Sequence, residues 1–290
     1  MKLQTEVSFE AAANKFHMDD SILVLGSCFS GCVGDRLQAL GMNVLVNPFG
    51  PLYNAASMRS ALERIVSGEH FTQEDCVSLG AGSSRICSFH HHTLASRTDA
   101  ESFLQDANAV LDEAHAFWQN CNKIILTLGS SWCYRHIERD MIVSNCLKRD
   151  AREFRREFLS LEQIEEQLQC MYALACASGK KRDMVVTVSP IRHFKDGAHG
   201  NMLSKANLLL VSDRLVQEHD NVEYFPAYEI MMDELRDYRF YAEDMLHPSA
   251  QSENYIFERF IEWGFSPAGR AELARRQQAL KRSLHISKMQ

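Results

Sequence analysis

Five short apolar runs separated by helix-like segments constrain the fold of this chain more than any other feature. The runs cover residues 21–25, 43–46, 123–128, 184–188 and 222–225. Most are continuously apolar rather than alternating, which is typical of strands covered on both faces in a parallel sheet. Helical patterns lie between them, at about 30–40, 55–67, 100–120, 161–178 and 201–219. The alternation predicts an α/β fold, a three-layer α/β/α sandwich with a mainly parallel, doubly wound sheet.

The chain has 290 residues, 46% of them hydrophobic, which is enough for one substantial core. We expect a single domain over 1–265, with irregular insertions near 71–97 and 132–158. The second insertion is predicted to hold a hairpin around 138–140, followed by a charged amphipathic helix at about 152–158. Apolar residues are sparse in 266–290, which indicates a C-terminal surface helix or a partner-binding tail.

Composition excludes several classes of partner. The formal net charge is -7, so no basic face for nucleic acid is expected. No apolar stretch reaches the roughly 20 residues that cross a bilayer, so no membrane segment is expected. Nine irregularly spaced cysteines, with no leader-like pattern at the first residues, predict reduced thiols and a cytoplasmic protein. The oligomeric state is not indicated.

The segment 26–30, Gly-Ser-Cys-Phe-Ser, directly follows the first apolar run. Gly26 leaves room for a tight turn, so Ser27 is expected at the carboxyl edge of the sheet, where ligands bind in open α/β folds. Amides of the following helix could there stabilise a developing oxyanion. A serine in this position also commonly caps the helix. Both interpretations, nucleophile and cap, fit the turn alone.

A second segment, Asp-Met-Leu-His at 244–247, could supply the base that such a nucleophile needs. Pro248 closes this segment and favours a loop, so His247 is expected to be accessible. The three-residue spacing lets Asp244 hold the imidazole tautomer that leaves one ring nitrogen free for Ser27.

Other residues allow competing interpretations. Cys28 would be the stronger nucleophile, but adjacent turn residues point in different directions, so only one can face His247, and buried packing is the usual role of such a cysteine. Side chains of consecutive residues rarely bind the same metal ion, so no metal is expected at the histidines 90–92. One of these rings could instead touch substrate. Arg192 could hold an anionic group, although a surface carboxylate pair is expected. Segment 231–237 is interpreted as a polar turn or short helix with solvated charges.

Five segments together carry a family resemblance: 26–30, 46–50, 127–130, 188–193 and 238–249. The chain resembles, over about 24–263, the GSCFA domain family of the SGNH, or GDSL-like, hydrolase superfamily. The resemblance implies that Ser27 is the nucleophile and that Asp244 and His247 form the last conserved block. It also implies that Gly50, with Asn47 nearby, contributes to the oxyanion site.

The chain departs from the superfamily pattern at 129–132, where Gly-Ser-Ser-Trp lacks the expected asparagine. Losing one oxyanion donor typically costs about 2.7 to 4 kcal/mol of transition-state stabilisation. Four side chains are candidate substitutes: Ser130, Ser131, Asn47 and His193.

These observations predict a serine esterase or acyl-transfer enzyme that acts on a small-molecule or carbohydrate ester without a metal or organic cofactor. The amides of Ser27 and Gly50 are expected to hold the oxyanion. The missing asparagine also motivates an alternative, a catalytically weak or inactive scaffold that binds a ligand without converting it.

Overall fold

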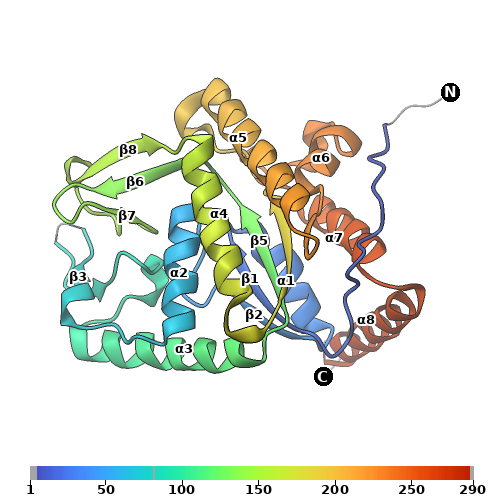
Figure 1. Cartoon of the computed structure of the whole chain (residues 1–290), viewed down its shortest axis with the longest axis horizontal. Coiled ribbons are helices and arrows are strands. Elements are labelled where there is room, and N and C mark those ends of the chain that lie inside the picture. The colour runs from blue at the N-terminus through green and yellow to red at the C-terminus, as the bar shows by residue number, and fades with distance from the viewer. Residues whose placement is uncertain (1–4, 81, 288–290) are drawn as a thin grey trace.

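The computed structural model of the chain describes residues 5–80 and 82–287, and a parallel sheet forms the centre of this part (Figure 1). The sheet has five strands in the order β10, β9, β5, β1, β2, and every neighbouring pair is parallel. The strands are β1 Ser21–Gly26, β2 Asn43–Val46, β5 Lys123–Leu128, β9 Asp183–Val188 and β10 Val222–Tyr224. The order reverses between β1 and β5, whose carboxyl ends form the switch point where open α/β sheets bind ligands.

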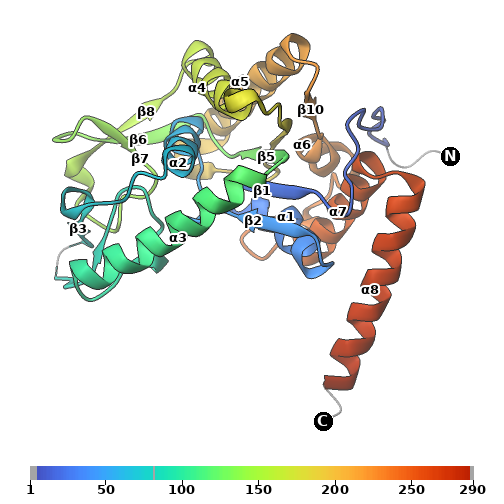
Figure 2. The same cartoon turned by 60° about the horizontal axis from the view of Figure 1, so that its bottom comes forward.

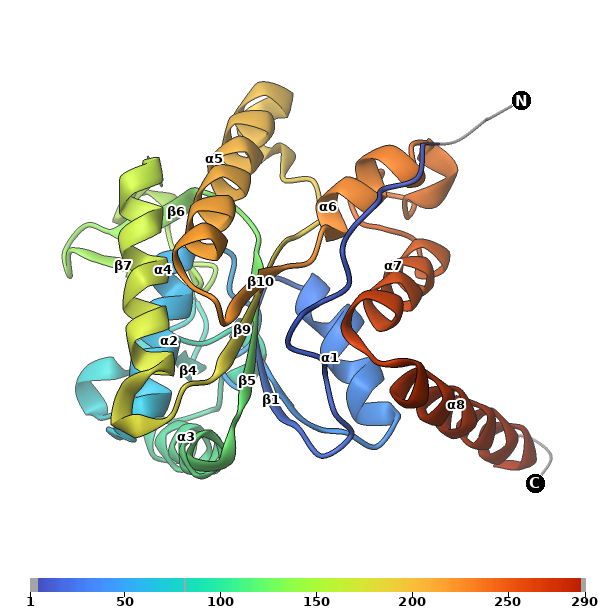
Figure 3. The same ribbon diagram turned by 45° about the vertical axis from the view of Figure 1, so that its right-hand side comes forward.

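Helices cover both faces of this sheet (Figure 3). One face carries α2 Ala55–Ser67, α3 Ala100–Asn120, α4 Leu161–Ala175 and α5 Gly197–Glu218, and the other carries α1 Phe29–Ala39, α6 Ala227–Glu229 and α7 Ala250–Gly264. Alternate strand residues serve the two layers: Leu23 and Leu25 point to the first, Ile22 and Val24 to the second. The predicted three-layer α/β/α class is confirmed.

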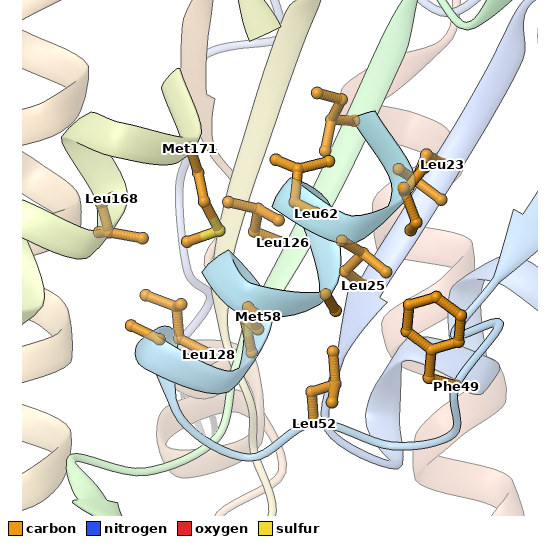
Figure 4. Packing of buried hydrophobic residues seen from close by; sticks show 14 of the residues in the cluster. Leu23, Leu25, Phe49, Leu52, Met58, Leu62, Leu126, Leu128, Leu168 and Met171 are labelled. Atoms are coloured by element: carbon orange, nitrogen blue, oxygen red, sulfur yellow. The ribbon is translucent and has the colours of Figure 1, made fainter. Parts of the chain in front are cut away.

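The larger core lies between the sheet and α2, where Met58 and Leu62 pack on Leu25 and Leu126 (Figure 4). Local signals define this helix. The side chain of Asn54 accepts the amide of Ser57 at 2.9 Å at its start, and Gly68 ends it with a left-handed φ of 67°.

The segments predicted as insertions form two small antiparallel sheets. The first pairs β3 Val77–Ser78 with β4 Ile86–Cys87, and the second has the order β7, β6, β8, with β6 Trp132–His136, β7 Met141–Val143 and β8 Phe154–Phe158. The predicted hairpin is confirmed as the β6–β7 pair.

The helix predicted at about 152–158 is wrong, because most of this segment is the strand β8. Its first two residues face opposite sides, as in a strand: Phe154 is buried and Arg155 is exposed. The charges pair across the sheet rather than along a helix, with Arg135 Nε 3.1 Å from Glu157 Oε1. Tertiary pairing with β6 therefore decided the conformation.

Two C-terminal helices follow the sheet. Helix α7 was not predicted, although it begins at the capping residue Ser249 and buries one apolar face. Helix α8, Pro267–Ser287, matches the predicted surface helix and extends away from the body (Figure 2); residues 288–290, like 1–4 at the other end, lie outside the described residues. Its first half is attached through buried Leu273 and through Arg276, which donates to the carbonyl of Leu40 at 3.1 Å.

The prediction of a polar turn or short helix at 231–237 is confirmed in part, because α6 continues as a π-helical turn over Ile230–Glu234. The expectation that its charges are solvated is wrong for Glu234. This carboxylate is buried and lies 3.2 Å from the guanidinium of Arg259. The ion pair compensates for the loss of water around the carboxylate. No helix in the described part of the chain combines the length and apolarity needed to span a membrane.

Candidate active site

Gly26 ends β1 in a conformation that no other residue adopts easily. Its φ is +144°, and a Cβ there would lie 2.3 Å from the carbonyl oxygen of Thr127 on the neighbouring strand. Its amide donates to the side chain of Asn47 at 2.8 Å. The described structure therefore uses Asn47 to hold the turn, and the turn presents Ser27 and Cys28 at the carboxyl edge of the sheet.

Ser27 and Cys28 have opposite environments. Ser27 is fully buried, and its Oγ accepts the amide of Phe29 at 3.3 Å. The N-cap of α1 is Cys28 and has no side-chain cap hydrogen bond, so the capping interpretation of Ser27 is wrong. Cys28, expected to pack inside, is exposed instead, and its Sγ lies 3.3 Å from the hydroxyl of Tyr53. Burial in turn raises the pKa of Tyr53, with a further contribution from the Cys28 thiol.

His247 and Asp244 form a closely coupled pair in a tight loop. Nδ1 of His247 lies 2.5 Å from Asp244 Oδ2, and Asp244 Oδ1 accepts the amides of Leu246 and His247, each at 2.9 Å. These hydrogen bonds lower the pKa of Asp244 to about 2, so its carboxylate is ionised at neutral pH. A carboxylate can only accept, so His247 donates from Nδ1 and leaves Nε2 free.

The helices that follow the two motifs lie side by side. Cys32 in the first turns of α1 contacts the carbonyl of Glu253 in the first turn of α7 at 3.4 Å, and Arg36 pairs with the carboxylate of Glu253 at 3.2 Å. Helix α1 begins directly after Cys28, and α7 begins three residues after His247. The fold therefore brings the two motifs, at 26–30 and 244–247, to one edge of the sheet.

A cavity of about 310 Å³ opens at this edge, and His247, His193, Ser130 and Tyr53 contribute to its wall. The rings of Tyr53 and His193 lie edge to face, with centroids 6.0 Å apart. Tyr53 thus reaches His193 with its ring and Cys28 with its hydroxyl. Sequence reasoning missed this tyrosine, because it lies in a loop without any motif of its own.

His193 is neutral at physiological pH. Burial, followed by the nearby charges of Lys205, His247 and Arg156, lowers its pKa to about 4. Its Nε2 is buried and has no hydrogen-bond partner within residues 5–80 and 82–287. A ligand in the cavity could complete its hydrogen bonding.

Two of the expected oxyanion donors already have backbone acceptors. The amide of Ser27 donates to the carbonyl of Thr127 at 3.1 Å, and that of Gly50 to the carbonyl of Asn47 at 2.8 Å. The amide of Cys28, at the N-terminus of α1, has no acceptor among the described residues. Of the two serines, Ser130 lines the cavity, whereas Ser131 is buried and donates to Ser204.

The three consecutive histidines point to different neighbours. His91 is buried beside Ser88, and burial lowers its pKa to about 3; His90 approaches Ser60, and His92 accepts the amide of Leu94. None of the three belongs to the described cavity wall. No cluster of three or more metal-ligating side chains occurs in the described ranges.

Sequence reasoning also missed a buried lysine beneath the site. Lys205 on α5 is almost completely inaccessible and donates to the carbonyl of Gly129 at 2.8 Å and that of Ser189 at 2.7 Å. Burial lowers its pKa to about 7. It joins the carboxyl ends of β5 and β9, and a lone lysine in a helical pattern gives no signal of this role.

The fold and the site define an α/β protein with a candidate acid–base pair and a candidate nucleophile at the carboxyl edge of its sheet. The chain belongs to the GSCFA family, whose sequence model matches residues 21–260. No protein with curated annotation matches it significantly.

Two solved structures are similar in part. A psychrotrophic esterase, EstA, from Pseudoalteromonas sp., inhibited by monoethylphosphonate, has 11% identity and a TM-score of 0.39, with 84% of this chain and 96% of that chain covered. A candidate platelet activating factor from Streptococcus pneumonia has 12% identity and a TM-score of 0.41, with 84% of each chain covered.

Proposed function

We propose that the protein is an acyl-ester hydrolase or acyltransferase that uses a nucleophile from the turn at 27–28. The observation that carries the proposal is the Asp244–His247 pair, which leaves an imidazole nitrogen free at a cavity beside this turn. His247 would accept the proton of the nucleophile and pass it to the leaving alcohol, and Asp244 would orient the ring.

The turn offers two nucleophiles, and the exposure of their side chains favours Cys28 over the predicted Ser27. Ser27 is fully buried and accepts a hydrogen bond from Phe29, whereas Cys28 is exposed next to a cavity residue, Tyr53. The thiolate would attack the ester carbonyl and form a thioester as the alcohol leaves. Water or an acceptor hydroxyl would then release the acyl group.

The free amide of Cys28 supports the same assignment. It lies at the N-terminus of α1, where backbone amides stabilise negative charge, and it would donate to an oxyanion formed at its own side chain. The neutral His193 is a second candidate donor, in place of the asparagine that the sequence lacks.

Short-chain nitrophenyl esters, a fluorophosphonate probe and iodoacetamide test the proposal, with peptide mapping of the labelled residue. We expect Cys28→Ala to lose at least about 100-fold in kcat/KM. Ser27→Ala should retain activity within about tenfold, and Cys170→Ala serves as a thiol control. Loss of activity in Ser27→Ala, with full activity in Cys28→Ala, would return the role to Ser27. Absence of turnover and of any labelling in wild type would favour a ligand-binding protein.

A further inference from the structure

We infer that the cavity takes an ester bearing an anionic group, held by Arg192 and Lys195. The inference rests on the proposed function and adds the substrate class. Besides His247 and His193, the cavity wall carries three basic side chains, Arg156, Arg192 and Lys195, and no Asp or Glu belongs to the described wall. This local excess contrasts with the formal charge of -7 for the whole chain.

Arg156 is already neutralised. Its guanidinium forms a two-point ion pair with Asp196, one contact of which joins Nε and Oδ1 at 3.0 Å. The same guanidinium lies over the rings of Trp132 and Tyr134. Arg156 therefore stabilises one wall of the cavity and leaves the other two cations to act on a ligand.

Arg192 and Lys195 have no carboxylate partner in the part of the chain that the structure describes. The expected surface pair of Arg192 is wrong: its guanidinium lies 4.3 Å from the ring centroid of Phe194 and 5.7 Å from that of Tyr241. Lys195 Nζ lies 4.7 Å from the ring centroid of Tyr134. Aromatic rings thus hold both cations in place without neutralising them.

A cationic wall favours a ligand that brings its own negative charge. Charge-assisted hydrogen bonds from arginine and lysine to a carboxylate, phosphate or sulfate are stronger than neutral ones, and arginine can bind such groups in bidentate fashion. His247, at the same wall, would face the ester bond. The cations would therefore orient the ester relative to the catalytic pair.

A matched pair of esters tests the inference: 4-nitrophenyl hydrogen succinate, which is anionic, and 4-nitrophenyl butyrate, which is neutral. We expect wild type to prefer the anionic ester by at least about tenfold in kcat/KM at low salt. The Arg192→Gln/Lys195→Gln double variant should lose about 10- to 100-fold on the anionic ester and less than about threefold on the neutral one. Arg236→Gln, which removes an exposed cation outside this cavity, should leave the ratio unchanged.

Equal use of both esters by wild type, or an unchanged ratio in the double variant, would overturn the inference. If neither ester is turned over, the proposed function fails. Calorimetric titration with monomethyl succinate and methyl butyrate then tests separately whether the cavity binds the anionic group. Binding of the succinate ester alone, lost in the double variant, supports the subsite; equal or absent binding of both esters excludes it.

Discussion

The carboxylate of Asp244 lies 2.5 Å from Nδ1 of His247, although both side chains are about half exposed, at 46% and 50%. In Asp244→Asn the ring loses its ionised partner and the tautomer is no longer fixed, so we expect kcat/KM for an ester to fall about 10²- to 10⁴-fold. Steady-state kinetics measures this loss. Glu243→Gln removes the same charge from the adjacent exposed residue and should stay within about twofold of wild type; an equal loss in both variants would indicate a bulk charge effect.

The turn depends on Gly26. A methyl group at this position would meet the backbone oxygen of Thr127 at 2.3 Å in a conformation that side chains rarely adopt. We expect Gly26→Ala to destabilise the fold by about 3 kcal/mol or more, measured by urea denaturation. In Gly31→Ala, on the adjacent helix, the new methyl meets only the flexible carboxylate of Asp35, so stability should remain within about 1 kcal/mol. A tolerated Gly26→Ala would contradict this account of the turn.

Leu62 on α2 is fully buried against the central sheet. Truncation to alanine removes buried methyl groups and leaves a cavity, so the free energy of unfolding should fall by about 2 to 5 kcal/mol. Leu210→Ala on α5 is the matched control, because that side chain is 55% exposed and its loss should change stability by less than about 0.5 kcal/mol. Similar midpoints for the two variants in denaturant would show that α2 is not part of the cooperative core.

Lys205 makes stability depend on pH. Its pKa in the folded protein is about 7, below the ordinary 10.5, because burial disfavours the charged form. Between these values the unfolded chain binds more protons, so the free energy of unfolding contributed by Lys205 rises with pH, by at most about 1.4 kcal/mol per pH unit.

Denaturant titrations between pH 7 and 8.5 measure this dependence. We expect the rise to be reduced in Lys205→Met and retained in Lys181→Met, where the lysine is exposed. Parallel curves for wild type and Lys205→Met would show that Lys205 is not the group responsible.

Much of the sheet was predictable, because a parallel strand buried on both faces is a continuous apolar run in the sequence. The run at 123–128 and the helical patterns that flank it predict β5 and the sandwich class. The family was indicated instead by the five motif segments, and its sequence model matches residues 21–260. The segment at 152–158 shows the limit of local pattern. Its charges fit a helix equally well, and only the pairing of β8 with β6 made it a strand.

The sequence by itself determined the alternation of strands and helices and, through its motifs, the pairing of Asp244 with His247, which depends on three-residue spacing within one loop. Only the tertiary structure decided that Cys28 rather than Ser27 is exposed, because burial depends on how Tyr53 and β5 pack over the turn. The charge of the cavity was decided in the same way. Whether Arg192 finds a carboxylate depends on which side chains the fold places beside it. Here they are the ring of Phe194, two residues along the chain, and that of Tyr241 from a distant segment.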